Sequence, residues 1–228
     1  MSEIENLFVE ETLLENIKIA AYFILLYEYF EDKVISTVRD FYSCPCMVDG
    51  KQYSDIDDAY IRCLKRKIQN GEVRRIPLKI SLEAARKKRE AYKRDVLGEE
   101  QEKDAKVFRG SLRWLQRYKV ISSEDYSLIL SIRKRRNALV HELLHEIGHG
   151  LMDRDAQMIA SLLNIQQRIN SWRFLKMDMP VMGIELPENI NPKDVIDGDD
   201  AILQGIFRIL FCGEGQQFKE ALEKEYMK

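Results

Sequence analysis

The stretch SEDYSLILSIRKRRNALVHELLHEIGHGLMDRD, residues 123–155, decides the fold expected for this chain. Apolar residues recur in it at helical spacing, and it contains no proline and no glycine before Gly148. This spacing is typical of an amphipathic α-helix. Ser122 precedes the stretch and Asp125 follows three positions later, which resembles the capping box that begins many helices. We therefore expect one unbroken helix from Ser122 or Ser123 to Gly148.

Helical spacing also dominates the rest of the chain. We expect a long first helix over residues 9–42, stopped by the Cys44-Pro45-Cys46 segment and by Asp49-Gly50. Further helices are expected over residues 54–69, 81–96, 99–118, 153–175, 194–211 and 216–226. Residues 73–80 contain Pro77 and predict an extended connector, while the three prolines within 178–193 predict irregular structure. With no clear strand alternation, the chain is predicted to be all-α, an up-and-down helical bundle.

Length and composition favour a globular, soluble protein. The 228 residues suit a single domain 1–228, in which we expect residues 54–98 to form a helical insertion and 178–228 a C-terminal extension. No apolar run reaches the roughly 18–20 residues that cross a bilayer, and the N-terminus is acidic, so neither a membrane partner nor a secretory signal is expected. Four cysteines without regular spacing favour a reducing compartment, hence a cytoplasmic location.

Positive charge is concentrated in one part of the chain, although the net charge is only −2. Lysines and arginines outnumber acidic residues strongly between positions 62 and 94. These side chains either form solvated helix faces or follow the phosphates of a bound RNA. The candidate contacts to an RNA backbone are Lys65, Arg66, Lys67, Arg86, Lys87 and Arg89.

Three histidines, His141, His145 and His149, follow one another at four-residue spacing. They form two overlapping H-E-x-x-H sequences, the pattern in which two histidines bind zinc and the glutamate activates water. A catalytic zinc also needs a third protein ligand. The position where one peptidase family has it is Leu151, and residues 152–176 contain no glutamate. We therefore expect no metal and no cofactor, and we keep a zinc metallopeptidase as a minor alternative.

The sequence RNALVH, residues 136–141, supports a different chemistry. An imidazole with a pKa near neutrality can remove the proton of an RNA 2′-hydroxyl or protonate the leaving oxygen. A guanidinium can bind the phosphate as negative charge builds on it. Asn137 and His141 are one helical turn apart and share a face, and the long side chain of Arg136 can reach the same cleft. Cleavage of this kind requires no metal.

The stretch LRWLQRYKVISSEDYSLILSIRKRRNALVHEL, residues 112–143, resembles the HEPN superfamily of small helical bundles. The resemblance covers residues 108–150 and extends more loosely to the first helix. Many HEPN proteins are metal-independent endoribonucleases with an R-x(4–6)-H motif, often R-N-x-x-x-H. Carried over by position, Arg136 and His141 would be the catalytic pair and Asn137 the accompanying polar residue. We expect His145, Glu142 and Arg133 to contact substrate or to support these side chains.

The resemblance also implies partners. HEPN proteins commonly form homodimers in which two such helices face one composite cleft, so we expect a homodimer that binds RNA. The family includes toxins of toxin–antitoxin pairs and effectors of antiviral defence, which adds an antitoxin or a regulatory protein as an expected partner. One branch has a modified tyrosine two residues after the histidine, where this chain has Leu143. Other members are non-catalytic binding or scaffold modules, and this remains the main alternative function.

Overall fold

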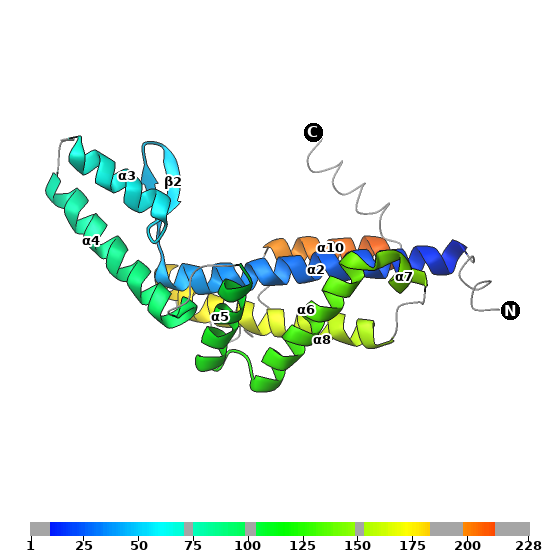
Figure 1. Cartoon of the computed structure of the whole chain (residues 1–228). Helices are drawn as coiled ribbons and strands as arrows, with labels where there is room; N and C mark the ends of the chain where they lie inside the picture. The colour runs from blue at the N-terminus through cyan, green and yellow to red at the C-terminus, as the bar shows by residue number, and fades with distance from the viewer. Residues whose placement is uncertain (1–9, 71–74, 99–103, 149–152, 183–197, 213–228) are drawn as a thin grey trace. The chain divides into compact units, whose positions relative to one another are not determined.

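The chain divides into two compact units, each treated by itself below. The computed structural model describes residues 10–70, 75–98, 104–148, 153–182 and 198–212. Met1–Phe30 and Ser122–Lys228 make up the first unit, called the terminal unit here, and Glu31–Ile121 make up the central unit. Residues 54–98, the expected insertion, lie wholly within the central unit. Helices form almost all of the described secondary structure, which confirms the all-α prediction (Figure 1).

The described part of the terminal unit is built from helices. Its elements are the part of α2 (Glu10–Tyr42) up to Phe30, then α6 (Ser123–His141), α7 (Leu143–Gly148), α8 (Asp153–Arg173), the π-helical segment η2 (Phe174–Asp178), α9 (Met179–Met182) and α10 (Gly198–Phe211). The buried apolar side chains come mainly from α2, α6 and α8: Ala20, Tyr22, Phe23, Leu26, Tyr27, Phe30, Ile129, Ile132, Leu139, Met158, Leu162, Ile165 and Ile169. These buried side chains are the apolar residues whose helical spacing in the sequence predicted α2, α6 and α8.

A partly buried polar centre joins three helices of the terminal unit. Asp200 of α10 accepts a hydrogen bond of 3.1 Å from the Tyr29 hydroxyl of α2. The side-chain amides of Gln166 and Asn170 of α8 donate to the same carboxylate. Both amide residues are almost completely buried. Because a buried polar group without a partner costs free energy, this shared carboxylate fixes α10 against α2 and α8.

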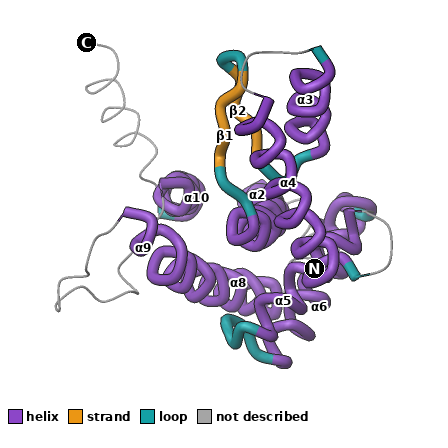
Figure 2. The backbone as a smooth tube through the Cα atoms, turned by 90° about the vertical axis from the view of Figure 1, so that its left-hand side faces the viewer, coloured by secondary structure: helices purple, strands orange, loops and turns teal. Residues whose placement is uncertain are grey.

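The central unit contains the only strands of the described chain. It consists of residues 31–42 of α2, β1 (Pro45–Val48), β2 (Lys51–Ser54), α3 (Asp58–Gln69), α4 (Arg75–Tyr92), the π-helical segment η1 (Lys93–Leu97) and α5 (Asp104–Arg117). Figure 2 shows the β1–β2 hairpin beside α3 and α4. One small core between α3 and α4 contains Tyr60, Ile61, Leu64 and Ala85. A second gathers around Trp114, whose indole N–H donates to the Tyr42 hydroxyl at 2.9 Å.

The hairpin corrects the expectation that the chain has no strands. β1 and β2 pair antiparallel, with Cys46 opposite Tyr53, and Asp49 and Gly50 form the turn between them. Both turn residues have positive φ angles, 53° and 73°. Asp-Gly is a preferred pair for a two-residue hairpin turn because both positions must adopt this conformation. Strands of four residues are too short for their alternation to stand out from the surrounding helical pattern.

Two further boundaries differ from the prediction. The segment 73–80, expected to be extended, is helical from Arg75 onward. Pro77 therefore lies in the first turn of α4, where its missing N–H would have had no partner within the helix. The prolines of 178–193 likewise predicted irregular structure, but Met179–Met182 form α9 with Pro180 inside it. The remainder of 178–193, and the helix expected over 216–226, lie outside the described residues.

Candidate functional site at the end of α6

The helix that carries the RNALVH sequence begins at the predicted cap. The Asp125 backbone N–H donates to Ser122 Oγ at 3.1 Å, and the Ser122 N–H donates to the Asp125 carboxylate at 2.8 Å. This reciprocal pair confirms the capping box, with aspartate in the position where glutamate is usual. Arg168 of α8 contacts the same carboxylate at 2.7 Å. Burial opposes the effect, but the hydrogen bonds from Ser122 and Arg168 lower the pKa of Asp125.

Arg136 is held by three neighbours. Its Nη1 donates to Asn137 Oδ1 at 3.0 Å, and its Nη2 forms an ion pair with Glu28 of α2. The guanidinium carbon lies 6.0 Å from the centre of the Tyr27 ring, which places the cation over an aromatic face. The Arg136 Nε is buried without a hydrogen-bond partner among the described residues. The guanidinium is thus oriented by α2, while part of it stays accessible to solvent.

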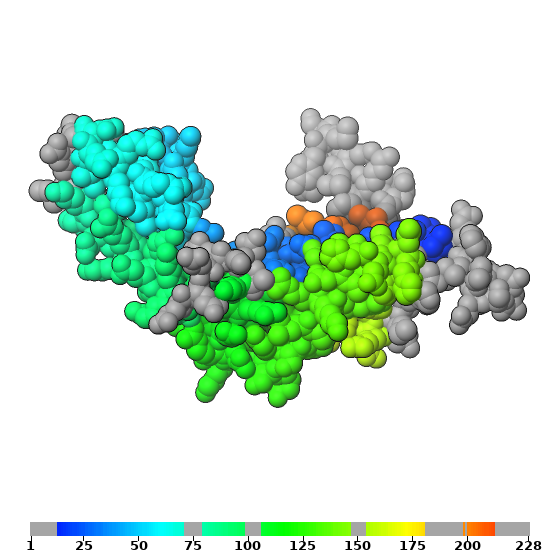
Figure 3. Space-filling view, viewed as in Figure 1, coloured from blue at the N-terminus to red at the C-terminus, as the bar shows by residue number. Residues whose placement is uncertain are grey.

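His141 is the last residue of α6, and its side chain is exposed. Asn137, one turn earlier, is exposed as well, so both predicted polar residues lie on the surface of the terminal unit. Figure 3 shows the light-green segment that includes the end of α6 and α7 at the surface of the face in view. Five positions correspond to about 140° around a helix, so Arg136 does not lie directly above His141.

The unbroken helix expected from Ser122 to Gly148 is interrupted at Glu142. This residue has φ −123° and ψ 32°, which are not helical angles, and α7 begins directly after it. No glycine or proline lies at the bend. The chain stays compact there, because the Glu142 N–H donates to Ala138 O at 2.8 Å and the Glu146 N–H donates to Glu142 O at 2.9 Å. The other residues that we expected to assist, His145 and Arg133, lie on α7 and α6.

Arg135 is the residue of this region that the sequence did not single out. Its Nε and Nη2 donate to the two carboxylate oxygens of Asp155, on α8, at 2.7 and 2.9 Å. Its Nη1 contacts the Glu146 carboxylate of α7. Asp155 is only 2% exposed, so this bidentate pair is shielded from water. The hydrogen bond to Asp155 is the largest of the effects that raise the pKa of Arg135, and the cation therefore joins α6, α7 and α8 at all ordinary pH values.

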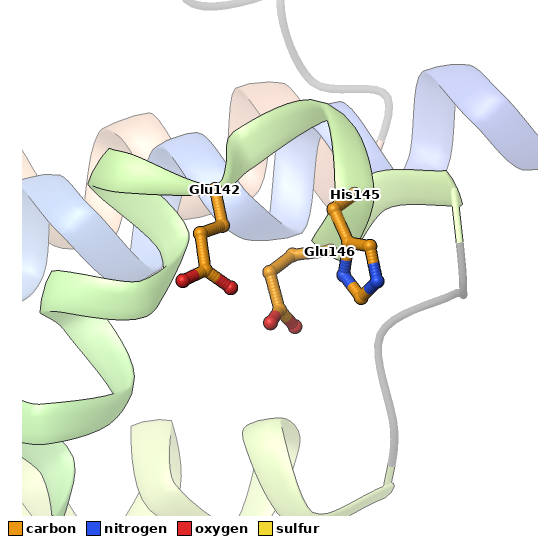
Figure 4. A group of neighbouring side chains, drawn as sticks. All are labelled: Glu142, His145 and Glu146. Atoms are coloured by element: carbon orange, nitrogen blue, oxygen red, sulfur yellow. The ribbon is translucent and has the colours of Figure 1, made fainter.

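The bend separates the two histidines of the first H-E-x-x-H sequence. His141 ends α6 and His145 lies in α7, whereas a zinc peptidase needs both on one continuous helix. His149, the last histidine of the second such sequence, lies outside the described residues. Within the described chain, the group whose ligand atoms approach one another is Glu142, His145 and Glu146, without His141 (Figure 4). The geometry thus does not favour the peptidase alternative.

The six basic residues expected to contact RNA lie on α3 and α4 and differ in their surroundings. Lys65, Arg66, Arg86 and Lys87 are exposed. Lys67 and Arg89 are partly buried and engaged within the central unit: Lys67 pairs with Asp49 at 2.8 Å, and Arg89 pairs with Asp58 at 2.6 Å. Arg89 also donates to the backbone carbonyl of Ile56. The four exposed side chains are therefore better placed to meet a ligand than the other two.

A pocket of about 300 Å³ lies between α8 and α10 in the terminal unit. Tyr22 of α2 lies in its wall, and the pocket combines apolar side chains with the amides of Asn164 and Gln167 and the charged groups of Asp200 and Arg208. This pocket could not be predicted from the sequence, because its walls come from three helices that are distant in the chain.

No protein-family model, no curated protein and no solved structure matches the chain. None of the described helices is both long enough and apolar enough to cross a bilayer.

Proposed function

We propose that this protein is a metal-independent endoribonuclease of the HEPN type, a toxin or an effector of antiviral defence, with Arg136, Asn137 and His141 at its active site. The observation that carries the proposal is the arrangement at the end of α6. There, a guanidinium oriented by Glu28 and hydrogen-bonded to Asn137 lies on the same two turns as an exposed imidazole.

The chemistry follows from these groups. His141 removes the proton of a 2′-hydroxyl, and the 2′-oxygen then attacks the adjacent phosphorus. The bond from phosphorus to the 5′-oxygen breaks, the leaving oxygen takes up a proton from the protonated imidazole, and the products are a 2′,3′-cyclic phosphate and a 5′-hydroxyl. Arg136 stabilises the negative charge that develops on the phosphate. To do so, its guanidinium exchanges the Glu28 carboxylate for the phosphate as its ion-pair partner. Asn137 donates through its amide nitrogen, because its oxygen already accepts from Arg136.

A homodimer belongs to the proposal. Because Arg136 and His141 lie about 140° apart around α6, one helix alone does not present both directly to one phosphate. Two copies of the helix that face each other supply the guanidinium and the imidazole from opposite sides of one cleft. Expected partners beyond RNA and the second copy are an antitoxin or a regulatory protein.

The decisive experiment incubates purified protein with tRNA and total RNA in the presence of EDTA. We expect cleavage by the wild type, termini with 2′,3′-cyclic phosphate, and loss of cleavage in His141→Ala and Arg136→Ala. Lys134→Ala is the matched control, since Lys134 is an exposed cation on the same helix. Circular dichroism verifies the fold of each variant. Undiminished cleavage by His141→Ala, or a requirement for added zinc, would reject the proposal.

The pocket supports a second candidate, a non-catalytic binding module. Its volume suits a small molecule, and its mixed apolar and polar walls are typical of ligand sites. Expression in a bacterial host separates the two functions. A ribonuclease arrests growth, and the double variant Arg136→Ala/His141→Ala removes the arrest; a binding module gives the same growth with and without that double substitution.

A further inference from the structure

The bend between α6 and α7 brings together three side chains with metal-binding chemistry. Figure 4 shows the carboxylates of Glu142 and Glu146 and the imidazole of His145 side by side, on the same side of the ribbon. One ligand atom from each lies within 4.8 Å of the other two. The Glu146 N–H donates to the Glu142 carbonyl, so Glu142 begins the turn that α7 continues. Residues three and four positions apart are neighbours on such a turn, which explains why the side chains converge.

Two carboxylates and one imidazole are a ligand set for a transition-metal dication. Zinc binds carboxylate oxygen and imidazole nitrogen at about 2.0–2.2 Å, so two ligands of one ion lie at most about 4 Å apart. A pair of ligand atoms separated by as much as 4.8 Å must therefore move about 1 Å closer, and Glu142 and His145 are exposed and can shift without repacking the core. The imidazole favours zinc, cobalt or nickel over magnesium and calcium, which prefer oxygen ligands alone.

The surroundings of the cluster fix one ligand in place. Arg135 contacts Oε2 of Glu146 and also both oxygens of the buried Asp155, so Glu146 is anchored while its second oxygen can face an ion. Two carboxylates, Glu146 and Asp155, contact this one guanidinium, and the Glu142 carboxylate lies beside that of Glu146. A dication beside Glu142 and Glu146 would balance their negative charge, and Arg135 would remain as the outer support that metal ligands commonly have.

We propose that Glu142, His145 and Glu146 form a binding site for a divalent transition metal that joins the end of α6 to α7. The ligand set differs from that of the H-E-x-x-H sequence, where His141 and His145 would bind and Glu142 would not. The site does not take part in the proposed RNA cleavage, which needs no metal. Its test is metal binding, so the result does not depend on whether the protein cleaves RNA.

Isothermal titration of tag-free protein, stripped with EDTA and dialysed, tests the site. We expect one Zn²⁺ per chain with micromolar affinity and no measurable binding of Mg²⁺. Each of Glu142→Gln, His145→Gln and Glu146→Gln should weaken Zn²⁺ binding by at least about tenfold, because each removes one ligand. His141→Gln is the matched control and should bind as the wild type does, since His141 lies outside the cluster.

Three results would overturn the proposal. The first is no binding of Zn²⁺ by the wild type. The second is loss of binding in His141→Gln with normal binding in Glu142→Gln, which would assign the ion to the two histidines of the H-E-x-x-H sequence instead. The third is wild-type affinity in both Glu142→Gln and Glu146→Gln, which would place the ion elsewhere. Glu142 and His145 are exposed, so their variants are expected to fold. If Glu146→Gln does not fold, the variants of Glu142 and His145 alone decide the test.

Discussion

Two adjacent arginines near the end of α6 have different surroundings, although the sequence presents them as one basic run. Arg136 is oriented toward Glu28, whereas Arg135 turns to Asp155 and Glu146. The Asp155 carboxylate is buried, so removal of the guanidinium would take the bidentate cationic partner away from a buried charge. Loss of one partner of such a pair costs about 3–5 kcal/mol. Arg135 is therefore expected to contribute to stability far more than its neighbours.

Arg135→Met tests this expectation. We predict that it lowers the free energy of unfolding by about 3 kcal/mol, measured by urea denaturation at neutral pH. Lys134→Met is the matched control, because Lys134 is exposed on the same turn, and its effect should stay within about 0.5 kcal/mol. Equal effects of the two substitutions would contradict the assigned role of Arg135.

Gly110 shows a constraint of close packing at a single residue. It lies within α5 of the central unit, and a Cβ atom built there would overlap the backbone carbonyl oxygen of Val96 in η1. We predict that Gly110→Ala lowers the free energy of unfolding by about 1–3 kcal/mol, because the backbone must move to admit the methyl group. Gly198→Ala is the control, since no atom lies within 4 Å of its built Cβ. Thermal unfolding of both variants measures the difference, and a neutral Gly110→Ala would show that α5 and η1 can separate at no cost.

At the scale of the element, the capping of α6 by Asp125 makes the stability of the fold depend on pH. The pKa of Asp125 lies below its ordinary value of 3.8, so its carboxylate stabilises the fold fully above that pH. The contribution is lost as the pH falls through the lower pKa of the folded state. We predict that Asp125→Asn lowers the free energy of unfolding by about 1 kcal/mol at pH 7, and that the difference from the wild type shrinks progressively as the pH falls below 3.8. Urea denaturation at several pH values measures it, and a difference that does not change with pH would contradict the charge-based explanation.

The elements that sequence analysis predicted correctly are those determined by local spacing. The extent of α2 and the Ser122–Asp125 cap follow from apolar periodicity and from side chains three residues apart. The β1–β2 hairpin was missed, although the Asp49-Gly50 turn carried a signal that would have predicted it. The bend at Glu142 had no local signal. Arg135 links the segments on both sides of it to α8, and such tertiary contacts are not visible in the periodicity of one helix.

The same distinction applies to the candidate site. The spacing of Asn137 and His141 on one face could be read from the sequence, because it follows from the helical period. The partners that orient or anchor the neighbouring side chains could not. Glu28 comes from α2, more than a hundred positions before Arg136, and Asp155 comes from α8. Nothing in the sequence marks these two carboxylates among the other acidic residues.

At the scale of the whole molecule, the small net charge is the sum of a positively charged central unit and a negatively charged terminal unit. The central unit contains 22 lysines and arginines against 15 aspartates and glutamates, whereas the terminal unit contains 14 against 23. Under the proposed function, an RNA chain would therefore be attracted mainly to the central unit, while the residues proposed for cleavage belong to the terminal unit. Binding and cleavage should consequently respond to different substitutions.

Replacement of the four exposed cations Lys65, Arg66, Arg86 and Lys87 by alanine tests this division. Each contact between a cation and a phosphate of single-stranded RNA contributes about 0.7 to the slope of log affinity against log salt concentration. We predict that the slope falls by about 3 and that affinity drops most at low salt, measured by fluorescence anisotropy with a labelled RNA.

Arg154→Ala/Lys176→Ala, which removes two exposed cations of the terminal unit, should leave the slope unchanged. His141→Ala should bind RNA with the wild-type slope, because that substitution removes the proposed proton transfer and leaves the phosphate contacts of the central unit intact. An unchanged slope in the fourfold variant would place the RNA contacts outside α3 and α4.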